Sequence, residues 1–164
     1  MLARKRKLRQ VGALPLLVNA DGGVEVFLVT ARGSGRWIIP KGNLIPGLAP
    51  HEAATQEARE EAGLIGLAES HCIGTFEFSR RRRGRDTTCL VDVDLLMVKL
   101  QMRKWAEAAQ RSVLRCNVET ALSLVGSSSL AFLIEQHLSP QVQSGRLGPS
   151  DQASVSQWSY AGQP

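Results

Sequence analysis

The stretch from Gly42 to Leu64 constrains the fold of this chain more than any other, because in it a broken loop leads into a sharply bounded helix. Prolines and glycines interrupt the sequence up to Pro50, so regular structure is not expected there. Pro50 suits the first turn of a helix, where its missing N–H would have no partner, and Gly63 is a good stop at the other end. We therefore expect a loop over residues 41–50 and a helix over residues 51–62.

The expected helix carries three glutamates, Glu57, Glu60 and Glu61, at positions i, i+3 and i+4. One helical turn brings the three carboxylates onto the same face, where like charges repel by roughly a few tenths of a kcal/mol per pair. Such a cluster is tolerated most easily where a cation neutralises it, and an all-oxygen ligand set selects Mg²⁺ or Mn²⁺. A solvated acidic face on an alanine-rich helix is the alternative, so the surrounding residues decide between the two.

The same stretch resembles the Nudix box, whose pattern is G-x5-E-x7-R-E-U-x-E-E-x-G-U, with U a bulky apolar residue. The opening glycine, the three helix glutamates and the closing pair Gly63-Leu64 match it, and residues 36–41 are similar to the strand and turn that enter the box. Two positions differ, since Leu48 replaces the first glutamate of the pattern and Gln56 replaces its arginine. On this resemblance, residues 9–138 are identified as a domain of the Nudix (MutT-type) hydrolase family.

The resemblance implies an α/β fold, the Nudix α/β/α sandwich, in which helices flank a mixed β-sheet. It also implies a Mg²⁺-dependent hydrolase, with Mn²⁺ as an alternative metal, in which water attacks phosphorus and cleaves a pyrophosphate bond. The expected substrate is small and phosphorylated: a nucleoside diphosphate derivative, a dinucleoside polyphosphate or a diphosphoinositol polyphosphate. A bound Mg²⁺ neutralises such a substrate and keeps only a few protein ligands, so a short carboxylate cluster is sufficient.

The box also implies roles for single residues. The metal ligands would be Glu57, Glu60 and Glu61, together with the main-chain carbonyl of Lys41 just before the box glycine. The base that deprotonates the attacking water is less fixed in this family. It is expected to be one of the box glutamates or a glutamate of a later loop, for which Glu107 is the candidate.

Cations are expected to bind the phosphates of the substrate. The segment Thr30-Ala31-Arg32 is similar to the phosphate-binding segment of Nudix enzymes that act on diphosphoinositol polyphosphates and dinucleoside polyphosphates, which assigns a phosphate to Arg32. Arg9, Arg81 and Arg83 are expected at the same mouth. Arg115 stands where that subgroup tends to have a tryptophan, so the chain departs from the subgroup there.

The two departures inside the box leave a second interpretation open. Leu48 and Gln56 are both neutral, so their joint presence strands no buried charge, and we expect the fold to survive with weaker metal binding and a lower rate. The alternative is a catalytically weakened Nudix module that binds a phosphorylated ligand or RNA. Two basic runs, residues 4–9 and 80–85, would attract such polyanions, within a net charge of +5. Nucleic acid is not favoured as a partner, because the sequence shows no recognition module and few aromatic residues.

Outside the box, strand and helix patterns predict the remaining elements. β-Branched and aromatic residues predict strands over residues 10–19, 24–30, 37–39, 72–79 and 89–100. Pro15 suits an edge or a bulge of its strand and not a central ladder. Asn117 is a suitable N-cap for a helix over residues 118–125, and Ser127 or Ser128 for a second helix with an apolar stripe that ends near residue 138. A polar, irregular segment is expected over residues 99–111.

Alternation predicts the buried face of the last strand. Aspartates are expected on the partly wet face, and the apolar side chains at every second position should share the buried one: Val91, Val93, Leu95 and Met97.

The two ends of the chain read as a flexible basic arm over residues 1–8 and a disordered tail over residues 139–164, rich in Ser, Gln, Gly and Pro. A signal peptide ending at Ala20 is a weaker interpretation of the N-terminus, since cleavage there would remove the first strand. No apolar run reaches the roughly 20 residues that span a bilayer. Three widely spaced cysteines favour free thiols in a reducing cytosol. We expect a cytoplasmic protein without membrane contact, as a monomer or homodimer.

Overall fold

A computed structural model describes residues 7–139 of the chain, so the expected tail from residue 140 and most of the expected arm lie outside the described residues. Its strands are β1 (Lys7–Val18), β2 (Val24–Thr30), β3 (Trp37–Ile38), β4 (Lys41–Asn43), β5 (Leu64–Arg82), β6 (Arg85–Gln101) and β7 (Val113–Asn117). Its helices are α1 (Pro50–Ala62), α2 (Val118–Leu124) and α3 (Ser128–Leu138). Within these residues no helix is long and apolar enough to cross a membrane.

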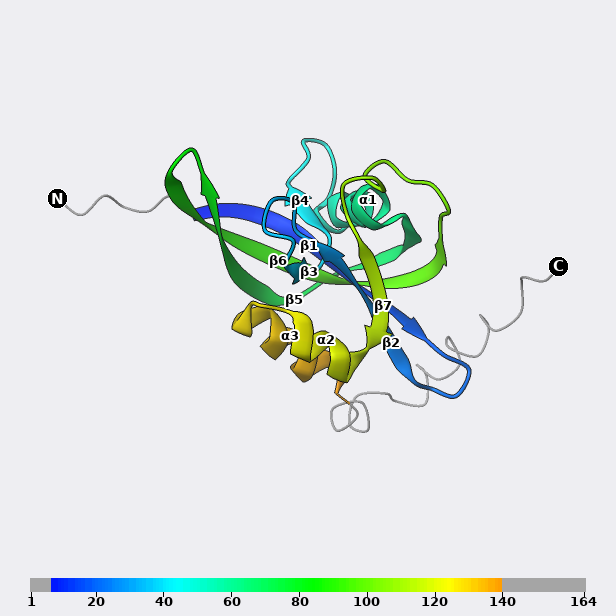
Figure 1. Ribbon diagram of the computed structural model, residues 1–164. Helices are drawn as coiled ribbons and strands as arrows, with labels where there is room; N and C mark the ends of the chain where they lie inside the picture. Colours follow the sequence, from blue (N-terminus) through cyan, green and yellow to red (C-terminus); the bar gives the residue numbers. More distant parts are fainter. Residues whose placement is uncertain (1–6, 140–164) are drawn as a thin grey trace.

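One mixed sheet organises the described part of the chain. Its strand order is β3-β2-β1-β6-β5, with β4 paired to β1 and β7 paired to β2. β1 and β6 run parallel, whereas the other pairs are antiparallel. Figure 1 shows α1 on one face of this sheet and α2 with α3 on the other. The expected α/β/α sandwich with a mixed sheet is therefore confirmed.

Pro15 was expected at an edge or a bulge, but it lies in β1, a central strand that pairs with β6 along most of its length. The other side of β1 explains why a proline is tolerated. There β1 pairs with β4 at residues 10–12 and with β2 at residues 16–18, so Pro15 falls in the gap between two partners. A missing N–H costs no ladder hydrogen bond at such a position.

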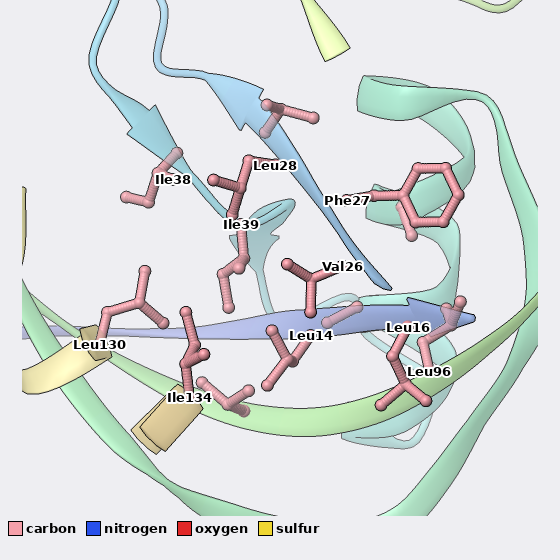
Figure 2. Close-up of a cluster of buried hydrophobic side chains, with 14 of the residues drawn as sticks. Leu14, Leu16, Val26, Phe27, Leu28, Ile38, Ile39, Leu96, Leu130 and Ile134 are labelled. Atoms are coloured by element: carbon pink, nitrogen blue, oxygen red, sulfur yellow. The ribbon is translucent and has the colours of Figure 1, made fainter. Parts of the chain in front are cut away.

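The core forms on both faces of β6, and this corrects the expected alternation. Val91 and Val93 are fully buried as predicted, but Met97 is 37% exposed while its neighbour Leu96 is fully buried. The sheet is covered on both sides, so the buried positions change faces along a long strand instead of keeping to one. Figure 2 shows the part of the core where Leu130 and Ile134 of α3 lie beside Leu14 of β1.

Three strand segments were missed from the sequence. Lys41–Asn43 (β4) was expected as loop, residues 64–71 extend β5 well ahead of the expected start at residue 72, and β7 was not expected at all. Each forms by pairing with a partner that already exists: β4 with β1, the start of β5 with β6, and β7 with β2. None shows a strong alternating pattern of its own, so tertiary pairing decides its structure.

Helix α1 follows the boundaries that its proline and glycine predict. Pro50 lies in its first turn and Gly63 ends it with a left-handed φ of 68°. Ala49 has no side chain to cap the helix, but the Glu52 carboxylate accepts the Ala49 N–H at 2.7 Å. The buried face of α1 consists mainly of small residues, which lets the helix approach the sheet closely: Ala53, Ala54, Ala58 and Ala62.

The two terminal helices begin at the caps that the sequence indicated. Asn117 accepts a hydrogen bond from Thr120 N, and Ser127 accepts one from Leu130 N. Ser127 also donates to the carbonyl of Glu77, while Ser129 accepts the Glu77 N–H at 3.0 Å. The first turn of α3 therefore satisfies backbone groups at the exposed edge of β5, where unpaired groups would otherwise invite association. His137 bonds the Leu133 carbonyl through Nδ1 at 2.9 Å.

Candidate active site

Glu57 points from α1 toward the turn that carries β4. Its carboxylate lies so close to the Cα of Gly42 that a Cβ atom there would come nearer than 3.0 Å to three of its atoms. Burial raises the pKa of Glu57, and the negative charges of Glu60 and Glu107 raise it further. The glycine that opens the box thus makes room for a carboxylate whose pKa is raised by burial and by two neighbouring carboxylates.

Glu61 is the most buried carboxylate of the described site, with 4% of the residue exposed. Both of its oxygens have a donor: Oε1 accepts from Arg111 Nη2 at 2.5 Å, and Oε2 accepts from the Lys41 N–H at 3.2 Å. Burial raises the pKa of Glu61 to about 7, although the charges of Arg111 and Lys41 act in the opposite direction.

Arg111 links three residues of the site, although the sequence pattern assigned it no role. Its guanidinium donates through Nη2 to Glu61, through Nε to Glu107 at 2.9 Å and through Nη1 to the Thr30 carbonyl at 3.0 Å. Its side chain is only 8% exposed. The available signal was the excess of carboxylates near the box, which requires a buried cation from some distant part of the chain.

Glu107 connects this buried arginine to an exposed one. Its Oε1 lies 3.3 Å from Arg32 Nη1, and its Oε2 accepts from Arg111. Arg32 also donates to Gln110 and leaves 61% of its side chain exposed. Two expected site residues, Glu107 and Arg32, are therefore brought together at the mouth of the site, where a phosphate can reach the arginine.

Trp105 fixes the segment that delivers Glu107 and Arg111. Its indole Nε1–H donates to the Glu61 carbonyl at 3.1 Å, and its ring lies where a Cβ atom at Gly63 would stand. The Glu107 N–H donates to the Glu60 carbonyl at 3.0 Å. The segment after β6 is thus hydrogen bonded to the last turn of α1 at two points, independently of Arg111.

Glu60 is the exposed member of the three box glutamates. Its Oε1 accepts from the Gln56 amide at 2.8 Å, so the residue that replaces the box arginine holds Glu60 instead. Both side chains line a shallow groove of about 610 Å³ on the outer side of α1. Leu48, which replaces the first box glutamate, is 38% exposed and so leaves no buried gap. The two substitutions are accommodated without a buried unpaired charge, as expected.

Lys41 contributes its main chain to the site, but its side chain has another environment. The ammonium lies 3.9 Å from the centre of the Phe78 ring, a cation–π contact. Burial lowers the pKa of Lys41. The backbone N–H of the same residue holds Glu61, so this position orients a carboxylate in addition to offering the carbonyl that the box pattern assigns to the metal.

The remaining expected substrate residues lie outside this cluster. Arg9 in β1 makes a bidentate ion pair with Asp92 of β6, at 2.7 Å from its Nη2. Arg81 and Arg83 are exposed near the tip of the β5–β6 hairpin. Neither has an ion pair with another described residue. The structure therefore brings Arg32 to the glutamates and leaves the hairpin arginines as a separate basic surface.

The residues around Glu57 fit a divalent cation in their chemistry. Carboxylate oxygens and a main-chain carbonyl are the hard ligands that Mg²⁺ and Mn²⁺ prefer, and Gly42 leaves Glu57 the room to present one. In their present arrangement, however, no three Asp, Glu, His or Cys side chains of residues 7–139 gather closely enough to hold a metal ion. Arg111 holds Glu61 and Gln56 holds Glu60.

Comparison with known proteins agrees with this fold. A profile described as the NUDIX domain matches residues 8–119. Nudix hydrolase 13, mitochondrial, of Arabidopsis thaliana is 25% identical over 134 residues, which cover 78% of this chain and 66% of that protein. Diphosphoinositol polyphosphate phosphohydrolase 3-alpha of Mus musculus is 36% identical over 74 residues, 44% of each chain.

Solved structures show the same fold. The binary complex of a C. elegans Ap4A hydrolase matches with a TM-score of 0.59 and 20% identity, over 79% of this chain and 93% of that one. A NUDIX hydrolase from Nitrosomonas europaea matches with a TM-score of 0.61 and 19% identity, over 80% and 88%. At such identities the likeness concerns the fold alone, so the chemistry has to be argued from the residues of this chain.

Proposed function

The chain belongs to the Nudix family, and from this premise we propose that it is a Mg²⁺-dependent hydrolase that cleaves a pyrophosphate bond by water attack at phosphorus. The observation that carries the proposal is the chain of ion pairs that joins the box glutamate Glu61 through Arg111 and Glu107 to the exposed guanidinium of Arg32. Carboxylates of this kind hold a hard cation, and the arginine binds a phosphate of the substrate next to it. The family consists typically of pyrophosphohydrolases.

In this proposal Glu57 and Glu61 hold the cation with the Lys41 carbonyl, and Glu60 contributes after leaving Gln56. When bound, the cation supplies charge neutralisation and makes an attacking water more acidic. Gly42 positions Glu57, and the Lys41 N–H orients Glu61 at 3.2 Å. Arg32 binds a phosphate of the substrate at the mouth.

Glu107 serves in this proposal as a positioning residue. Each of its two oxygens faces a guanidinium, Arg32 on one side and Arg111 on the other. Because both oxygens are engaged in these ion pairs, the carboxylate holds the two arginines in place and is not free to turn toward a water. We therefore place the general base among the box glutamates.

The substrate class is proposed to be a highly charged one, such as a dinucleoside polyphosphate or a diphosphoinositol polyphosphate. The names of two matching proteins concern such compounds, and the exposed Arg81 and Arg83 of this chain offer further phosphate contacts. A cytoplasmic location stays a prediction of the sequence, since the matching plant relatives are named as mitochondrial and chloroplastic.

The test is a panel of dinucleoside polyphosphates, nucleotide sugars, ADP-ribose, oxidised nucleotides and inositol pyrophosphates, incubated with Mg²⁺ or Mn²⁺. Release of phosphate or nucleotide from at least one member supports the proposal. Glu57→Gln and Glu61→Gln should each abolish that release while circular dichroism stays unchanged. Glu119→Gln on the exposed side of α2 is the matched control and should keep the rate.

A second candidate function is a Nudix module that binds a phosphorylated ligand without turning it over. It is favoured by one observation, that Gln56 and Arg111 hold two of the three box glutamates in the described arrangement. Calorimetric binding of a panel compound with no turnover under either metal would select this function. Turnover that Glu57→Gln removes would exclude it.

A further inference from the structure

We propose that Arg111 is a built-in competitor of the divalent cation at Glu61: the guanidinium and the cation are alternative partners of that carboxylate, and the site binds its cation by releasing Arg111 from Glu61. This inference rests on the proposed function, since it concerns the same site. It assigns to a residue outside the Nudix box the control of metal affinity inside it.

The geometry at Glu61 carries the first step. Both carboxylate oxygens have a donor, Arg111 Nη2 at 2.5 Å on one and the Lys41 N–H at 3.2 Å on the other. Mg²⁺ requires its oxygen ligands at about 2.0–2.1 Å with near-octahedral geometry. A cation at that distance from Oε1 would stand next to the guanidinium, and the two positive charges repel strongly in a site where Arg111 is only 8% exposed. On this inference Glu61 binds one of the two cations at a time.

The second step is that Arg111 can release Glu61 without leaving its place. Only Nη2 contacts Glu61, whereas Nε is held by Glu107 and Nη1 by the Thr30 carbonyl. On this inference, a rotation of the guanidinium about these two contacts would break the Glu61 ion pair while the positive charge stays hydrogen bonded. The chain of contacts continues from Glu107 to the exposed Arg32, so the released arginine stays connected to the place where phosphate is expected.

The alternative is a purely structural role, in which Arg111 attaches the segment after β6 to α1. Other contacts already do this, because Trp105 Nε1 binds the Glu61 carbonyl and the Glu107 N–H binds the Glu60 carbonyl. Neither contact involves Arg111. A purely structural role for Arg111 would therefore be redundant. The Glu61 carboxylate, which is 4% exposed, needs a neutralising cation whenever the metal is absent.

The test measures Mn²⁺ binding to the full chain, from the free Mn²⁺ signal in electron paramagnetic resonance, with no substrate present. Arg111→Gln should bind Mn²⁺ at least about tenfold more tightly than the unchanged protein, and Arg111→Lys, which keeps the charge but has one donor group for three acceptors, should gain less. Arg115→Gln is the matched control, because it removes an arginine–glutamate ion pair with Glu25 far from α1. Its affinity should not change.

An unchanged or weaker affinity in a folded Arg111→Gln protein overturns the inference, and so does an equal gain in the Arg115 control. If Arg111→Gln fails to fold, a Mg²⁺ titration of the unchanged protein tests the inference by NMR of the arginine side-chain nitrogens. The Arg111 signal should shift with the same Mg²⁺ midpoint as other signals of the site. An Arg111 signal that stays constant at Mg²⁺ saturation overturns the inference. Absence of Mn²⁺ binding in every variant would instead overturn the proposed function. Hydrolysis with an unchanged Arg111→Gln affinity would overturn the inference alone.

Discussion

The carboxylate of Glu57 lies directly against the Cα of Gly42, in the space that a Cβ atom would fill. The box glycine is therefore not needed for an unusual backbone conformation, since its φ is not among the positive values of this chain. It is needed because a side chain from α1, proposed above as a metal ligand, occupies the space above it. This contact joins the loop and the helix of the box in one small volume.

Gly42→Ala should consequently move Glu57 and leave the fold in place. The clashing atoms are the far end of a flexible side chain, so the carboxylate can swing away at the cost of its position. We expect kcat to fall at least about tenfold, because a displacement of about 1 Å can cost a factor of about 100. Steady-state kinetics with a thermal unfolding curve measures both effects.

Gly126→Ala is the control for that substitution, since its Cβ would meet only the Arg36 side chain at an ordinary distance of 3.7 Å. Equal losses in the two variants would contradict the assignment of Gly42.

Glu61 should make the stability of the protein depend on pH in an unusual direction. Burial raises its folded-state pKa from 4.5 to about 7, so between these values the folded protein binds a proton that the unfolded chain has lost. The free energy of unfolding should therefore fall as the pH rises through this window, by at most about 1.4 kcal/mol per pH unit. Glu61→Gln should lose this slope.

Urea unfolding at pH 5, 6 and 7 measures it, and the difference between the unchanged protein and Glu61→Gln isolates the contribution of this residue. Glu119→Gln should keep the slope. If the free energy of unfolding of the unchanged protein instead rises with pH relative to that of Glu61→Gln, the Arg111 ion pair outweighs burial.

Trp105 offers a test of how the loop is attached. Trp105→Phe keeps a ring over Gly63 but removes the hydrogen bond to the Glu61 carbonyl, so we expect a loss of about 1 kcal/mol in the free energy of unfolding. Trp37→Phe is the control, because no hydrogen bond of its indole N–H appears among the described residues. Chemical denaturation of both variants decides, and a larger loss in Trp37→Phe would contradict the role given to Trp105.

The box helix could be predicted from the sequence because its signals are local. Pro50 and Gly63 fix its ends, and the alanines fix its buried face. Asn117 and Ser127 indicated the two terminal helices for the same reason. Arg111 could not be predicted in this way. It meets Glu61 only because β7 pairs with β2 and brings residue 111 beside Thr30, and no local pattern indicated β7.

The side-chain partner of Glu60 shows the same limit inside the box itself. Its spacing placed it on one helix face with Glu57 and Glu61, but the spacing did not indicate the partner of its side chain. Gln56, four residues earlier, donates a hydrogen bond to the Glu60 carboxylate, which is exposed. Gln56, which replaces the arginine of the box, therefore supplies a local hydrogen bond that holds Glu60.

The last prediction concerns the hairpin arginines. Arg81 and Arg83 are exposed and have no ion pair with a described residue, so their charges are available to a substrate. In Arg81→Ala/Arg83→Ala we expect KM to rise most for the most highly charged member of the panel, while kcat stays nearly constant, because these side chains would contact phosphates away from the scissile bond. Arg103→Ala/Arg115→Ala removes the same number of charges elsewhere and should leave that preference intact. Since added salt screens exposed charges, raising the ionic strength should reduce the difference between the two double variants. A KM that rises equally for all substrates, or equally in both variants, would mean that the hairpin arginines contribute only to the general charge of the protein.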